Sequence, residues 1–255
     1  MLRKVTDLFG YKIRATDDDI GHVHDFYFDT EDWTMRYLVV DVGSWLFGRR
    51  ILIAPDALDV PDWNEQVLPV RLNKQQVKES PEVDLAQPVT RAYETSLFGH
   101  YGWAPYWGGA ATYAGGMGIE PSYVDTGNRA AYGNVPDEVA QALQNQDSYV
   151  QSLREMTNYS IEATDGTLGH VADFFVDDED WQIRYLLIDT GNWWPGKKVL
   201  VAPTWVNTVS WDDARIYVEL TQEKIKHSPE YDPDVAISRT YERDLHRYYG
   251  YPEYW

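Results

Sequence analysis

The chain carries the same sequence twice, and this duplication constrains its fold more than any other feature. Ile13-Arg14-Ala15-Thr16-Asp17 returns 148 residues later as Ile161-Glu162-Ala163-Thr164-Asp165, and Arg36-Tyr37-Leu38 returns as Arg184-Tyr185-Leu186. The offset holds without a gap as far as Tyr254-Trp255, which matches Tyr106-Trp107. We therefore expect two copies of one domain, each large enough to bury its own core.

Each copy reads as a series of short strands. Runs rich in aromatic and β-branched residues are separated by turn signals such as Asp165-Gly166. Asn73 and Thr221 are expected to cap short helices that stop before a Ser-Pro pair. In the first copy we predict strands at 11–15, 22–28, 35–42, 50–54 and 67–72, and in the two copies longer helices at 89–101 and 237–249. Several short strands closed by a helical turn predict a mainly β fold of two small barrels in tandem.

The repeat also sets the expected domain boundaries. A first barrel covers residues 1–84, and a helical and aromatic extension covers 85–107. Residues 108–148, rich in Gly, Ala and Tyr, are expected to form a linker with a short helix at 136–144. The second barrel covers 149–232 and its extension covers 233–255.

Charge and composition exclude several classes of function. The net charge is −19 without a cluster of Lys and Arg, which argues against nucleic acid and anionic lipid as partners because both require positive charge. The lack of cysteine excludes thiol catalysis and Cys-ligated metal sites. There is no signal peptide and no stretch of about 18 apolar residues, so we expect a soluble, cytoplasmic protein without a transmembrane segment.

The motifs of the two copies resemble those of a known family. Gly-x-Val-x-Asp-Phe, Trp-x-x-Arg-Tyr-Leu, Asp-x-Gly-x-Trp and Leu-x-Ala-Pro recur in both copies in the same order. This series is similar to that of the PRC-barrel family, which includes the cytoplasmic barrel of the photosynthetic reaction centre H subunit and the C-terminal barrel of a ribosome maturation factor. The resemblance implies a small β-barrel used chiefly for protein–protein contact, with no general catalytic motif. The chain lacks the membrane helix of the first protein and the N-terminal domain of the second, so neither specific role is carried over.

Two histidine–aspartate pairs are the candidates for ligand binding or acid–base chemistry. His22 with Asp25 and His170 with Asp173 resemble a base oriented by a carboxylate. Three positions apart on a strand, however, the two side chains point to opposite faces. A carboxylate that accepts structural hydrogen bonds is the favoured interpretation.

Metal binding is weighed for the same region. His22 and His24 alternate on one face, but the second copy has Ala172 in place of the second histidine. The acidic turns 29–32 and 177–180 lack the spacing of a calcium loop and are interpreted as solvated turn tips. We therefore expect no catalytic residue, no cofactor and no metal.

Exposed aromatic residues are the candidates for interaction with a partner. Two loops and the two extensions carry them, and each set is open to two interpretations: contact with another protein, or packing on the chain's own barrels, including the barrel of the other copy. The candidates are Trp45, Phe47, Trp193, Trp194, Tyr106, Trp107, Tyr254 and Trp255.

These features favour a non-catalytic protein–protein interaction or scaffolding module whose partner protein is unidentified. Two alternatives stay open: a peripheral subunit of a membrane-associated complex, and a small-ligand or metal-binding protein. A homo-oligomer is also compatible with the sequence.

Overall fold

The computed structural model describes residues 1–46, 48–107, 149–191 and 197–255. These residues belong to two compact units. One unit contains the described residues of Met1–Gly10, Asp25–Arg36 and Gln151–Trp255, and the other contains those of Tyr11–His24 and Tyr37–Val150. Two segments of the first repeat are therefore part of the unit that holds the second repeat.

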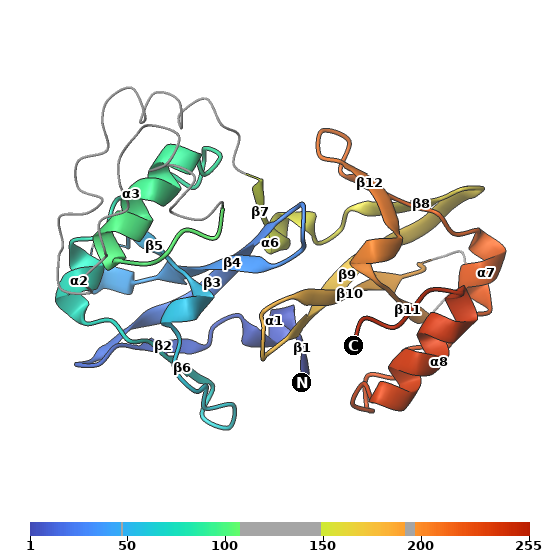
Figure 1. The fold of residues 1–255 in the computed structure, drawn as a ribbon, viewed down its shortest axis with the longest axis horizontal. Helices are drawn as coiled ribbons and strands as arrows, with labels where there is room; N and C mark the ends of the chain where they lie inside the picture. The colour runs from blue at the N-terminus through green and yellow to red at the C-terminus, as the bar shows by residue number, and fades with distance from the viewer. Residues whose placement is uncertain (47, 108–148, 192–196) are drawn as a thin grey trace, which may run out of the picture. The chain divides into compact units, whose positions relative to one another are not determined.

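The first repeat is mainly β, as its sequence predicts (Figure 1). Its strands are β1 (Leu2–Lys4), β2 (Lys12–Arg14), β3 (Asp19–Asp29), β4 (Met35–Asp41), β5 (Arg50–Ile53) and β6 (Val67–Pro69). Its helices are α1 (Val5–Leu8), α2 (Lys74–Lys78) and α3 (Arg91–Tyr101), with 3₁₀ turns η1 (Gly43–Leu46) and η2 (Pro55–Ala57).

The second repeat has the same order of elements and one additional strand. Its strands are β7 (Val150–Ser152), β8 (Ser160–Ala163), β9 (Gly166–Asp177), β10 (Ile183–Asp189), β11 (Lys198–Val201), β12 (Val206–Ser210) and β13 (Arg215–Val218). Its helices are α6 (Leu153–Met156), α7 (Gln222–Lys226) and α8 (Arg239–Tyr249), with the 3₁₀ turn η3 (Pro203–Trp205).

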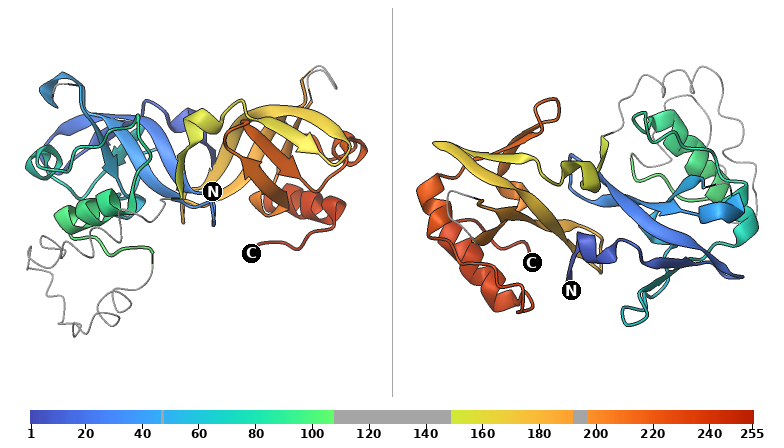
Figure 2. Two further views of the ribbon diagram at one scale, coloured as in Figure 1. Left: turned by 90° about the horizontal axis from the view of Figure 1, so that it is seen from above. Right: turned by 180° about the vertical axis from the view of Figure 1, so that it is seen from behind.

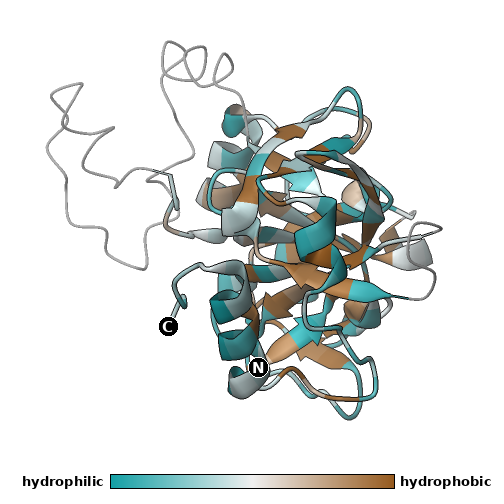
Figure 3. Ribbon diagram, turned by 90° about the vertical axis from the view of Figure 1, so that its right-hand side faces the viewer, coloured by the Kyte–Doolittle hydropathy of each residue, from teal (hydrophilic) through white to brown (hydrophobic). Residues whose placement is uncertain are grey.

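Each repeat builds one sheet around an apolar core. The strand orders are β5-β4-β3-β2-β6 and β11-β10-β9-β8-β13-β12. Strands β2 and β6 pair in parallel, as do β8 and β13. The inward side chains are fully buried, for example Ile13, Tyr37, Ile161 and Tyr185 at 0% exposure. Figure 3 shows the strands mainly in the colour of apolar residues and the turns mainly in that of polar ones.

The helix ends follow the local sequence signals. Asn73 and Gln76 form a reciprocal capping box at the start of α2, with both hydrogen bonds at 2.9 Å, and Thr221 caps α7. Helices α3 and α8 end at Gly102 and Gly250, whose φ angles of 72° and 81° suit glycine. Figure 2 shows α8, in red, along the strands of its own repeat.

The start of each repeat pairs with the sheet of the other repeat, which the sequence did not predict. Strand β1 runs antiparallel to β9, with Leu2 opposite Asp177 and Lys4 opposite Phe175, and the blue segment lies beside the gold strands in Figure 1. Strand β7, at the start of the second repeat, pairs with β3. A one-turn helix follows each of these strands and buries its apolar side chains, which are Val5, Leu8, Leu153 and Met156.

Candidate functional site

The carboxylates of Asp25 and Asp173 anchor the two exchanged segments. Asp25 accepts hydrogen bonds from the Ser152 hydroxyl at 2.5 Å and from the backbone N–H of Arg154 at 3.1 Å. Asp173 accepts the backbone N–H of Thr6 at 3.1 Å and also the Thr6 hydroxyl. Each carboxylate therefore holds the start of a one-turn helix that comes from the other repeat.

Burial sets the electrostatics of these two groups. Asp25 and Asp173 are 5% and 3% exposed, and desolvation raises the pKa of both carboxyls despite the hydrogen bonds that lower it. Each also accepts the backbone N–H of the following residue, at 2.7 Å from Phe26 and 2.8 Å from Phe174. The donors to these two carboxylates are backbone N–H groups and hydroxyls, which is the arrangement expected of structural aspartates.

The two histidines of the proposed pairs are more exposed to solvent than the aspartates. His22 is exposed and His170 is half-buried, whereas both aspartates are buried. Within the described ranges, no group of three or more His, Asp or Glu side chains is arranged to hold a metal ion.

His22 and Trp45, which were separate candidates in the sequence, line one hollow of about 830 Å³. The Trp45 indole N–H donates to the Ile20 carbonyl at 2.9 Å, and the Lys74 ammonium lies 4.9 Å from the ring centroid. Gly21 also lines this hollow. A Cβ at this position would overlap the backbone carbonyl of Asp41, so only glycine fits there. Trp45 is thus half-buried and fixed within its own unit, and its role in partner binding stays a prediction.

The acidic turn tips are paired with arginine. Arg36 contacts Asp32 and lies 3.6 Å from Asp29, and Arg184 contacts Asp180 and lies 3.9 Å from the Asp177 carboxylate. The arginines come from the Trp-x-x-Arg-Tyr-Leu motif of each repeat. These pairs offset the negative charge that a hard cation would require.

The aromatic extension of the first repeat covers a buried glutamate that the sequence analysis missed. Glu94, 0% exposed, accepts hydrogen bonds from the hydroxyls of Tyr37 at 2.7 Å and Tyr106 at 2.6 Å. Arg91 forms an ion pair with Glu94 at 2.7 Å and lies 4.3 Å from the Trp107 ring centroid. Burial raises the pKa of both tyrosines, with the charge of Glu94 as the next contribution.

The second repeat builds the same cluster with one substitution. Glu242 accepts the Tyr254 hydroxyl at 2.5 Å and pairs with Arg239 at 3.1 Å, and Arg239 lies 4.8 Å from the Trp255 ring centroid. His246 takes the place of Phe98, and its Nε2 lies 3.0 Å from the Tyr185 hydroxyl. These contacts place each extension on its own repeat; the segments that cross between repeats are the initial ones.

A sequence signal for these clusters exists. Arg-x-x-Glu recurs at 91–94 and 239–242, and a tyrosine follows the glutamate by 12 residues in both copies. On a helix, residues three apart face the same side. The pattern therefore indicates an inward ion pair that the later tyrosine closes.

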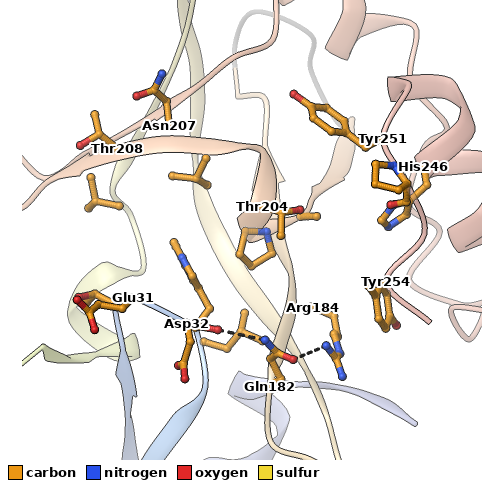
Figure 4. A pocket seen from close by; sticks show the side chains of 18 of the residues that line it. Glu31, Asp32, Gln182, Arg184, Thr204, Asn207, Thr208, His246, Tyr251 and Tyr254 are labelled. Atoms are coloured by element: carbon orange, nitrogen blue, oxygen red, sulfur yellow. Dashed lines mark hydrogen bonds between the residues drawn. The ribbon is translucent and has the colours of Figure 1, made fainter. Parts of the chain in front are cut away.

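A groove of about 920 Å³ lies in the unit that contains the second repeat (Figure 4). One wall is formed by Asn207 and Thr208, and across from it lie Glu31 and Asp32. The aromatic end is formed by residues of α8 and the extension, which are His246, Tyr251 and Tyr254. Of the interaction candidates named from the sequence, Tyr254 lines this groove, and the acidic turn 29–32 contributes Glu31 and Asp32.

Three of the interaction candidates, Phe47, Trp193 and Trp194, lie outside the described residues. Within the described residues, no helix is long and apolar enough to cross a membrane.

Comparisons with known proteins agree with the duplicated fold. The family model described as PRC-barrel domain matches residues 2–71 and 150–225, which together make up more than half of the chain. An uncharacterized protein of Deinococcus radiodurans is 40% identical over 72 residues, or 28% of this chain. The match covers 25% of that relative, so the chain spans about a quarter of the length of the curated protein it matches.

Proposed function

The chain belongs to the PRC-barrel family, and we propose that it is a non-catalytic interaction or scaffolding protein whose repeats bind another protein. We include a cytoplasmic location in this proposal, because a sequence without cysteine suits a reducing compartment.

The observation that carries the proposal is the way each repeat already binds a polypeptide segment. Strand β9 receives β1 by antiparallel pairing, and Asp173 receives the Thr6 backbone N–H at the start of the following turn. Main-chain pairing at a sheet edge is a common mode of peptide recognition. The sheets of this fold are therefore suited to holding extended polypeptide.

The chemistry of the candidate residues also supports binding rather than catalysis. Asp25 and Asp173 are occupied by backbone and hydroxyl donors, and Glu94 and Glu242 are enclosed by tyrosine and arginine. A general base must reach the proton that it removes. Carboxylates held in this way are suited to a structural role.

Capture of the tagged full-length chain from its native lysate, after mild crosslinking, tests the proposal. We expect one partner protein at a constant ratio to the captured chain, with crosslinks that locate the bound surface. A tag-only capture from the same lysate is the control. Recovery of the chain alone under several salt conditions would contradict a scaffolding role.

A further inference from the structure

Strand β12 leaves one edge of its sheet open. It is the last strand in the order β11-β10-β9-β8-β13-β12, and it pairs antiparallel with β13. No other strand pairs with β12 within the described part of the chain. An open edge presents a row of backbone N–H and C=O groups to any extended chain, and proteins usually protect such edges with proline or lysine.

The first repeat has this protection and the second does not. Residues 58–62 of the first repeat correspond to β12, and they include Pro61 at the position of Val209. There the structure has only isolated bridges, Leu58 with Val70 and Asp62 with Val67. Strand β12 reads Val-Asn-Thr-Val-Ser, without proline or lysine, and forms a complete strand.

The groove described above runs along this open edge. Its lining includes Val206, Asn207, Thr208 and Val209 of β12 and no residue of β13, so the groove lies on the side of β12 that β13 does not occupy. The opposite wall is the turn 30–33, as Figure 4 shows for Glu31 and Asp32. A strand added to β12 would occupy this space.

The charge around the groove is negative. Glu31, Asp32 and Glu253 line it, and the chain as a whole carries −19. Asp32 is paired with Arg36, and Glu253 lies 3.7 Å from Arg243, so Glu31 carries most of the charge argument. Arg184 also lines it, but this cation is paired with Asp180 and lies 4.4 Å from the Tyr254 ring centroid. An incoming segment with lysine or arginine side chains complements this surface.

We propose that β12 and the adjoining groove form a docking site for an extended, basic segment of a partner protein, which adds to the sheet as a further strand. The inference rests on the proposed function, since it takes the partner to be a protein. Backbone pairing with β12 supplies the geometry, and the acidic wall selects basic side chains.

A synthetic peptide of about eight residues with alternating lysine and valine is the probe, because that length spans an ordinary strand. Its binding to the full-length chain is followed by fluorescence anisotropy, and hydrogen exchange locates it. We expect new protection at 206–210 and weaker binding at high salt. A peptide with glutamate in place of lysine, and one with alternate backbone nitrogens methylated, should each bind at least about tenfold more weakly.

Two matched charge variants test whether binding depends on the acidic wall of the groove, and a third variant tests the open edge of β12. Glu31→Lys should weaken binding about tenfold, whereas Glu179→Lys, the same change at the equivalent position of the other repeat, should leave it within about twofold. Val209→Pro introduces the residue that the first repeat carries and should abolish binding. Unchanged exchange protection in β9 and β10, which do not pair with β12, would show that this variant is folded.

Equal binding of the lysine and glutamate peptides, or binding without protection at 206–210, would overturn the inference. A captured partner whose crosslinks avoid the groove, and whose capture survives Val209→Pro, would overturn it while leaving the proposed function intact. Absence of both peptide binding and a captured partner would count against both.

Discussion

Glu94 and Glu242 occupy the same place in the two repeats but differ in the exposure of the cation beside them. The side chain of Arg91 is 7% exposed and that of Arg239 is 54% exposed. A buried ion pair depends on both partners, because removing one leaves an uncompensated charge away from water. An exposed arginine is solvated when its partner is lost.

This difference predicts unequal effects of one substitution. Glu94→Gln should lower the free energy of unfolding by about 3 kcal/mol, and Glu242→Gln by about 1 kcal/mol. Urea unfolding of both variants, followed by circular dichroism, measures the two losses. Equal losses would show that the exposure of the arginine does not decide the contribution of the pair.

The buried carboxyl of Asp173 predicts a dependence of stability on pH. Its folded-state pKa is raised above the ordinary value of 3.8 by desolvation, so protonation favours the folded state. Its contribution to the free energy of unfolding is largest below 3.8 and declines as the pH rises through the raised folded-state pKa. Urea unfolding of the chain and of Asp173→Asn measures this dependence across the range. The free energy of unfolding of the chain minus that of the variant should fall as the pH rises. A rise of this quantity with pH would contradict a raised pKa for Asp173.

At the scale of elements, the sequence predicted those parts of the fold that depend on local signals. Period-two patterns and capping residues located the main strands and the helices that start after Asn73 and Thr221. Helices α1 and α6 have four residues each and no periodicity to detect. Their stability comes from burial against the other repeat, which a local pattern does not encode.

The same reasoning explains what was missed at the candidate sites. Asp25 was interpreted as a structural aspartate, but its donors Ser152 and Arg154 could not be foreseen, because they are more than a hundred residues away in the sequence. The open edge of β12 also depends on strand order, which was not predicted. The sequence does hold a clue to that edge, since Val209 stands where the first repeat has Pro61, but this difference was not used to predict it.

The exchanged segments predict a local effect of core truncation. Leu8 lies on α1 and is 1% exposed. Its replacement by alanine should lower the free energy of unfolding of this segment by about 2–4 kcal/mol. Because the segment pairs with β9, hydrogen exchange should accelerate at 175–177 before the rest of the sheet opens. Met156→Ala is the matched change on α6 and should act on β3 instead. Uniform acceleration through both sheets would contradict independent release of the segments.

At the scale of the whole molecule, duplication provides two sheets and two segments that complete them. Strand β1 completes the sheet of the second repeat, and β7 pairs with β3 of the first. The pairing is specific, since Arg3 forms an ion pair with Asp178 at 2.7 Å, whereas the first repeat has Thr30 at the position of Asp178. Each repeat therefore depends on residues that the other supplies.

This dependence predicts that the two halves stay together after the chain between them is cut. A protease site placed within residues 108–148 and cleaved in the folded protein should give two fragments that co-elute in size-exclusion chromatography. The reason is that β1 and α1 stay paired with β9, with Val5 and Leu8 buried at 1% exposure. The cleaved Leu8→Ala variant should dissociate at a higher protein concentration than the cleaved parent. Separation of the parent fragments without denaturant would show that the exchanged segments do not hold the repeats together.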